Sequence, residues 1–202
     1  SAVANNTDIK CVVVMWSFLS RYDWAMPRHK SLENTRWTSI SPWDTNAGNE
    51  EALITLAGSE TQQEQWRTRR DTFAESGVKP FAEAIYKHAA NQYHETYLSW
   101  KSIIWLQNIL EKKKIPYMFT LADNTLFYNE FKQHKDQDTF MTALHDEINF
   151  NNWYFFGERK MGFNQWAMLE DYPRGTTHPL DEAHRDAVKL MLPTFKQLIG
   201  EK

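Results

Sequence analysis

The stretch DIKCVVVMWS, residues 8–17, determines how the rest of this 202-residue chain is interpreted. It is an almost unbroken run of apolar, largely β-branched residues between polar ends. Such a run is typical of a strand that is buried on both faces, as the strands of parallel sheets are. We therefore expect a buried parallel strand over residues 8–17.

A second run of this kind, IPYMFTLA at residues 115–122, follows a predicted helix. Apolar residues spaced by threes and fours extend from residue 81 to residue 110, which predicts one long helix or two abutting helices. The basic residues 112–114 suit the negative carboxyl end of that helix. Helix, short turn and strand form half of a βαβ unit, so we expect an α/β protein with right-handed crossovers.

Weaker signals predict three further elements. Ser59 followed by Gln62 resembles a capping box, which predicts a polar helix over residues 60–75. A short helix is expected over residues 140–148. The segment NFNNWYFF, residues 149–156, is either a brief strand or an aromatic packing segment.

The last helix is predicted over residues 179–199. Pro179 would occupy its first turn together with Asp181 and Glu182, and Pro193 is expected to kink or end it. Four apolar residues are expected to point inward from this helix: Ala183, Ala187, Leu190 and Met191.

Residues 18–50 are predicted to form a long, tryptophan-rich loop after the first strand. Trp24, Trp37 and Trp43 lie in it, and loops of this length in a compact domain are usually functional. Its tryptophans either fill a core or stack on flat ligands such as sugar rings. Residues 1–202 are expected to form a single domain. Two strong strands are too few for a complete sheet, so either another strand is poorly marked or the domain begins upstream of residue 1.

Composition argues against several classes of function. The net charge of −3 and the pI of about 6.2 come with no basic run that could follow a phosphate backbone, so nucleic acid is not expected as a partner. Cys11 is the one cysteine and is expected to be a buried, inert thiol. No stretch approaches the roughly 18 apolar residues of a membrane span. No histidine spacing meets a zinc template, so we expect no metal and no other cofactor.

The segment GTTHPLDEAHRD, residues 175–186, holds two histidines six residues apart. His178 directly precedes Pro179, which predicts that it is the N-cap of the last helix. The positive end of the helix would favour a neutral imidazole there, and a neutral imidazole is a usable base. The alternative is a histidine that only caps the helix or contacts a loop.

His184 lies within the first two turns of the same helix. It forms a row with Val188 and Met191, so we expect a half-buried packing residue. Asp181 and His184 also make an Asp-x-x-His pair one turn apart. This pair is either an orienting carboxylate with a base, or ordinary helix surface.

Further candidate residues follow the first predicted strand. Ser17 stands at its carboxyl end, where α/β sheets present ligands, and is a nucleophile if His178 lies within hydrogen-bond reach. A serine at this position also commonly caps the turn. Arg21 could hold an anionic group or pair with a surface carboxylate. Trp16 and Trp24 are candidate substrate-binding residues, together with His184.

Three segments, DIKCVVVMWSFLSR, KKKIPYMFTLA and GTTHPLDEAHRDAVKLMLP, together resemble the later two thirds of an SGNH (GDSL-type) hydrolase in the diverged form seen in bacteriophage genomes. The resemblance implies a three-layer α/β/α sandwich with a flavodoxin-like, mostly parallel sheet. It also implies hydrolysis of esters, often acetyl or acyl groups on carbohydrates or lipids. By the same resemblance His178 is the catalytic base, and His184 occupies a recurrent, non-catalytic helix position.

The chain departs from the family pattern at three places. Gly175 stands where the family has the aspartate of its Asp-x-x-His block. The strand ends in Trp16, Ser17 and Phe18, without the asparagine that helps to bind the oxyanion. No Gly-Asp-Ser nucleophile block is present, so the nucleophile lies upstream of residue 1, is replaced by Ser17, or is lost.

Two functions from different classes follow. The chain is a hydrolase of a small-molecule or glycan ester, or it is a non-catalytic phage virion-associated or glycan-binding module on the same fold. A sugar transferase that uses His178 as base is a weaker option. The host-cell cytoplasm or the virion is the expected location, without a membrane partner.

Overall fold

The computed structural model describes residues 9–25, 37–45, 59–128, 138–175 and 178–200. Backbone contacts divide the chain into two compact units. Unit 1 comprises residues 1–19, 93–174 and 179–202, and unit 2 comprises residues 20–92 and 175–178. The protein is of mixed α/β class, with a small parallel sheet in unit 1.

Unit 1 is built on two parallel strands, β1 (Val12–Trp16) and β4 (Tyr117–Leu121). The first residues of the two strands pair with each other, as do the last, so both strands end at the same edge. A single parallel bridge joins Phe119 to Trp153 on the other side of β4, where the Tyr154 N–H donates to the Phe119 carbonyl at 2.8 Å. Both predicted strands are therefore confirmed, and residues 149–156 contribute only this one bridge.

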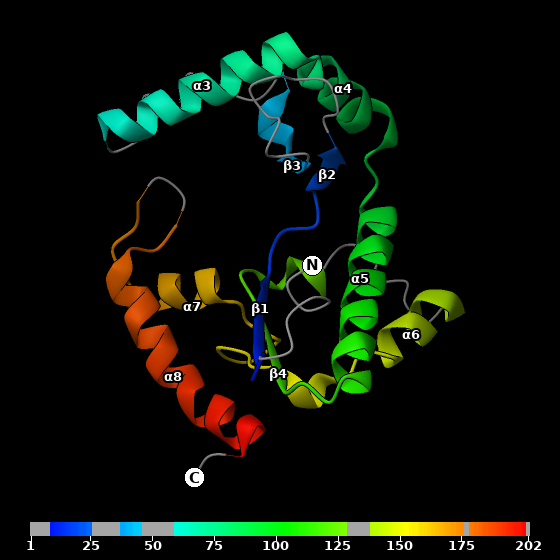
Figure 1. The fold of residues 1–202 in the computed structure, drawn as a ribbon, viewed down its shortest axis with the longest axis vertical. Coiled ribbons are helices and arrows are strands. Elements are labelled where there is room, and N and C mark those ends of the chain that lie inside the picture. Colours follow the sequence, from blue (N-terminus) through cyan, green and yellow to red (C-terminus); the bar gives the residue numbers. More distant parts are fainter. Residues whose placement is uncertain (1–8, 26–36, 46–58, 129–137, 176–177, 201–202) are drawn as a thin grey trace. The chain divides into compact units, whose positions relative to one another are not determined.

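Helices surround the strand pair of unit 1. They are α5 (Gln92–Lys112), α6 (Thr139–Asp146), α7 (Phe163–Leu169) and α8 (Asp181–Ile199), with the short 3-10 helices η4 (Asn124–Leu126) and η6 (Phe150–Asn152). Figure 1 shows α5 on one side of the strands and α7 and α8 on the other. The short helix expected over residues 140–148 is confirmed as α6, whereas α7 was not predicted.

The main core of unit 1 lies between the strands and α5. Phe119 and Leu121 of β4 are fully buried against Trp100 and Ile103 of α5. The Trp100 indole N–H donates to the Leu126 carbonyl at 3.0 Å, which ties η4 to α5. A second cluster joins α7 to α8 and contains Phe163, Trp166, Ala167, Ala183 and Ala187.

The prediction that the first strand is buried on both faces is wrong. Val13 is 48% exposed and Met15 is 41% exposed, whereas every residue of β4 is buried. The reason lies in the helix layer, because α8 contacts β4 and the outward face of β1 stays open. An apolar run reports how hydrophobic a strand is, but the neighbouring elements decide which of its faces is covered.

The last helix begins two residues later than predicted. Leu180 is its N-cap, with extended dihedral angles, so His178 is not the N-cap. The chain before the helix is held extended, because Pro179 bridges Arg174 and the Leu180 N–H donates to the Pro173 carbonyl at 2.9 Å. This pairing of residues 173–174 with residues 179–180 competes successfully with the helix signal of Pro179.

The structure bears on two further expectations for α8. Pro193 was expected to kink or end the helix, and the helix does not end there. Ala183 and Ala187 are buried as predicted, but Leu190 is 45% exposed. Small residues therefore make the close contact with α7, and the larger apolar residues of α8 do not all point inward.

Unit 2 contains an antiparallel pair and consecutive helices. Its elements are β2 (Tyr22–Ala25), β3 (Trp37–Ile40), the 3-10 helix η2 (Pro42–Asp44), α3 (Glu60–Ser76), α4 (Val78–Ala84) and the π-helical turn η3 (Ile85–Ala89). The Gln62 N–H donates to Ser59 Oγ at 3.3 Å, which confirms the predicted start of α3. Gly77, with φ of 76°, ends α3 in the left-handed region.

The apolar pattern over residues 81–110 belongs to two abutting helical segments, which was one of the two alternatives. The first consists of α4 and η3, and the second is α5.

The tryptophan-rich segment is not simply a loop. The backbones of Trp24 and Trp37 lie on β2 and β3, and these strands pair antiparallel with Tyr22 opposite Ile40. Ile40 is fully buried with Val78 and Ala82 of α4.

No helix in the described part of the chain has the length and apolar character needed to cross a membrane.

Candidate functional site at the carboxyl edge of the parallel strands

The carboxyl ends of β1 and β4 lie side by side. The Ala122 N–H donates to the Trp16 carbonyl at 2.8 Å, which continues the pairing one residue beyond β4. Ser17 and Asp123 therefore leave the two strands at adjacent positions, with Ser17 exposed and Asp123 half-buried. Ligands of α/β proteins bind at such an edge. We call the region formed by residues 17, 122–124 and 162–165 the carboxyl edge.

Gly162 brings the start of α7 directly onto the end of β4. A Cβ atom at this position would lie 2.6 Å from the Asp123 nitrogen and 2.7 Å from the Ala122 carbonyl carbon. Only glycine permits this approach, since both neighbours are backbone atoms. The Asn164 N–H then donates to the Ala122 carbonyl at 2.9 Å. This contact places the first turn of α7 against Ala122 and Asp123.

Gln165 fastens the same junction with its side chain. Its Oε1 accepts from the Gly162 N–H at 2.9 Å and from the Asn124 N–H at 3.1 Å, and its Nε2 donates to Asn124 Oδ1. One amide thus satisfies two backbone donors from segments about forty residues apart. The turn after β4 and the start of α7 are held as one piece.

Replacing Gln165 by alanine is expected to lower the free energy of unfolding by about 2 kcal/mol, since it leaves two backbone N–H groups without their acceptor. Urea unfolding measures this loss. Gln197→Ala, at an exposed position of α8, is the control and should change stability by less than about 0.5 kcal/mol. Equal, small effects of both substitutions would contradict the role assigned to the Gln165 amide.

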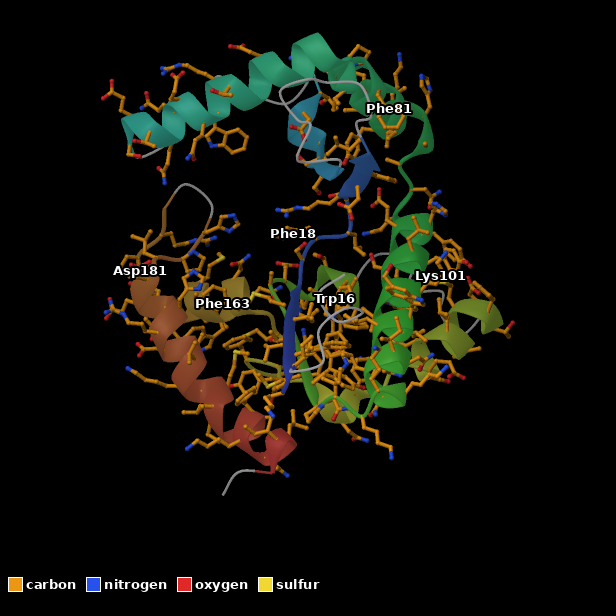
Figure 2. The ribbon with its side chains drawn as sticks, in the orientation of Figure 1. Trp16, Phe18, Phe81, Lys101, Phe163 and Asp181 are labelled. Atoms are coloured by element: carbon orange, nitrogen blue, oxygen red, sulfur yellow. The ribbon has the colours of Figure 1, made fainter. Side chains whose placement is uncertain are left out.

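His184 is connected to the carboxyl edge through α7. Its ring centroid lies 4.7 Å from that of Phe163, the residue that follows Gly162. Figure 2 shows Phe163 and Asp181 at the starts of α7 and α8, and Trp16 and Phe18 near the carboxyl end of β1. The expectation of a half-buried packing residue is wrong, because the His184 side chain is exposed.

His178 lies in a different part of the structure from Ser17. Its carbonyl accepts from the Gly175 N–H at 2.8 Å, and its side chain is exposed. Residues 175–178 group with unit 2, whereas Ser17 belongs to unit 1, so the structure does not assign them to one site. Asp181 is exposed in the first turn of α8.

The predicted substrate-binding residues are spread over both units. Trp16 packs against Phe119, with their ring centroids 5.6 Å apart, and its indole N–H is buried without a partner. Arg21 is exposed in unit 2. Trp24 lies on β2, and its side chain is outside the described part of the chain. Trp16 is therefore placed as a core residue beneath the edge.

The groups with clearly shifted pKa values lie outside the carboxyl edge. Burial raises the pKa of Tyr117, at the opposite end of β4, to about 12. A hydrogen bond from Lys189, at 2.6 Å, and one from the Tyr172 hydroxyl hold the pKa of Asp186 below its usual value. Cys11 is half-buried, and burial raises the pKa of its thiol, which makes it less reactive.

No external likeness supplies a function for this arrangement. The chain was compared with protein-family models, with curated proteins and with solved structures, and none of them matches it. Within the described residues, no three His, Cys, Asp or Glu side chains gather as metal ligands would.

Proposed function

We propose that this chain is an SGNH-type ester hydrolase that acts at the carboxyl edge, with Ser17 as the nucleophile and an imidazole from residues 175–186 as the base. One observation carries the proposal. The parallel strands β1 and β4 end together, an exposed serine follows β1, and α7, whose Phe163 contacts His184, begins against the end of β4. In the proposed fold, α5 and the pair α7–α8 are the two outer layers of an α/β/α sandwich around the parallel strands.

The proposed chemistry is acyl transfer to serine followed by hydrolysis. Ser17 Oγ attacks the carbonyl carbon of the ester while the imidazole accepts the hydroxyl proton. The imidazolium then returns this proton to the departing alcohol, which leaves an acyl-serine. Water repeats the sequence and releases the acid. An acylated carbohydrate or lipid is the substrate that the family resemblance implies.

Two histidines compete for the role of base. The resemblance to SGNH hydrolases selects His178, whereas the contacts within unit 1 connect His184 to the carboxyl edge. Asp181 precedes His184 by one helical turn and is the carboxylate proposed to orient it. Separate substitution of the two histidines distinguishes these assignments.

Hydrolysis of a p-nitrophenyl acetate and butyrate series by the purified chain tests the proposal. Ser17→Ala is expected to lower kcat/KM by at least about 100-fold, because a base without its nucleophile contributes little. The histidine whose replacement by alanine causes a similar loss is the base. Ser102→Ala, at an exposed serine of α5, is the control and should retain activity. Absence of turnover by the folded chain would refute the hydrolase proposal.

A second candidate function is a non-catalytic glycan-binding module on the same fold. It is favoured because backbone N–H groups at the carboxyl edge already donate hydrogen bonds, whereas binding of an oxyanion needs N–H groups that do not. Four of these donors are already engaged, namely those of Ala122, Asn124, Gly162 and Asn164. Quenching of tryptophan fluorescence by oligosaccharides, without ester turnover, would support this function over the first.

A further inference from the structure

Lys160 holds its ammonium group among aromatic rings of unit 1. Its Nζ lies 3.7 Å from the ring centroid of Phe150 and 4.7 Å from that of Phe127. Both distances are within the range of a cation–π interaction. The same Nζ lies 3.3 Å from Nε2 of His145. The residue comes from the loop of residues 157–161, so these contacts tie that loop to the aromatic cluster.

The contact with Lys160 favours one protonation state of His145. An ammonium group only donates hydrogen bonds, so the contact is a hydrogen bond when Nε2 accepts, which is the case in the neutral imidazole with its proton on Nδ1. Nδ1 faces Asp146 Oδ1 of the same helix at 3.6 Å. The elements packed against the ring present aromatic side chains, with ring centroids 5.2 Å away for Trp100 of α5 and 5.2 Å away for Phe150 of η6.

The loop that carries Lys160 is strained. Arg159 and Lys160 both have φ of 54°, in the left-handed region that residues with a Cβ atom rarely adopt. Two successive residues of this kind persist only where the surroundings hold them. The contacts of Lys160 provide such support, so their loss should let the loop relax.

We propose that Lys160 and His145 form a pH-sensitive latch, which keeps the loop of residues 157–161 closed near neutral pH and releases it on acidification. Protonation of His145 removes the acceptor at Nε2 and brings two positive charges within 3.3 Å. Asp146 lies next to Nδ1 of His145 and would attract the imidazolium there, whereas Lys160 lies next to Nε2. Lys160 is therefore the group that is repelled.

Opening of the latch would also weaken contacts at the carboxyl edge. Asn124 Nδ2 donates to the Arg159 carbonyl at 3.3 Å, and the loop runs directly into Gly162 and α7. Release of the loop thus removes one support of the junction between β4 and α7. The latch itself does not depend on the proposed ester hydrolysis.

The direction of the pH effect follows because the latch needs a neutral His145. An ordinary histidine protonates near pH 6.5. The latch contributes its full stabilisation well above that pH and loses it as the pH falls through the titration of His145. The loop should therefore open more often at about pH 5.5 than at about pH 7.5.

Hydrogen exchange of the full-length chain, followed by mass spectrometry and corrected for the intrinsic pH dependence, tests this inference. Amide protection in residues 157–162 is expected to fall about tenfold between pH 7.5 and pH 5.5. In His145→Gln, whose amide oxygen can accept from Lys160 but does not titrate, protection should be independent of pH. His94→Gln, at an exposed position of α5, is the matched control and should behave like the unaltered chain.

A second variant keeps the test decisive if His145→Gln is poorly folded. Lys160→Met retains the apolar stem and removes the charge, so the loop should have the low protection at both pH values. Protection that does not change with pH in the unaltered chain would overturn the latch. An undiminished pH response in Lys160→Met would overturn it as well.

Discussion

Gly162→Ala is expected to lower the free energy of unfolding by about 3 kcal/mol, because the added methyl group has no room. Its Cβ would lie 2.6 Å from the Asp123 nitrogen and 2.7 Å from two carbon atoms of the same backbone segment. Backbone atoms at the end of a paired strand cannot move aside without breaking the pairing. The start of α7 must therefore separate from β4, and Gln165 must lose part of its hydrogen bonding. Urea unfolding followed by circular dichroism measures the loss.

Gly157→Ala is the matched control for this substitution. A Cβ at Gly157 would meet the Met161 side chain at 3.1 Å, and the closest atoms are the flexible Cε and Sδ. We expect a loss below about 1 kcal/mol, since a methionine side chain can adopt another rotamer. If the two alanine variants were equally stable, the close approach of α7 to β4 would be wrong.

Phe119→Ala is expected to cost about 4 kcal/mol, the largest effect that we predict for the core. Phe119 is fully buried at the centre of β4, and its ring contacts Trp16, Tyr117 and Trp153 with centroid distances of 5.6, 4.7 and 5.4 Å. Truncation would leave a cavity lined by three rigid rings, which collapse poorly into the space. The midpoint of urea unfolding should shift accordingly.

Trp105→Ala provides the comparison for Phe119. Trp105 is 65% exposed on α5, so its removal should change the free energy of unfolding by less than about 0.5 kcal/mol. A large loss at Trp105 and a small one at Phe119 would mean that the core lies on the other face of α5. The order of the two effects therefore tests the packing of α5 against the strands.

Local signals in the sequence were sufficient for several elements. The two apolar runs predicted β1 and β4, and the Ser59 cap predicted the start of α3. The spacing of apolar residues predicted α5. The position of Ser17 at the end of a strand followed from the apolar run of residues 8–17. These features depend on residues that are neighbours in the chain, and such signals act over one or two turns.

Local signals failed where a different backbone pairing competes with them. Pro179 favours a helix start, but the pairing of residues 173–174 with residues 179–180 moves the start to Asp181. His178 consequently precedes the N-cap Leu180 and is not itself the helix cap. The roles of Ser17, His178, Asp181 and His184 stay predictions, as does the single-domain organisation.

The sequence by itself determined the α/β class, the two parallel strands and the serine that follows the first of them. Only the tertiary structure decided that one face of β1 is open, that Gly162 lies against Ala122 and Asp123, and that Lys160 contacts His145. The physical reason is range. Strand and helix propensities depend on near neighbours, whereas burial, close backbone approach and charge contacts arise between segments that meet only after folding.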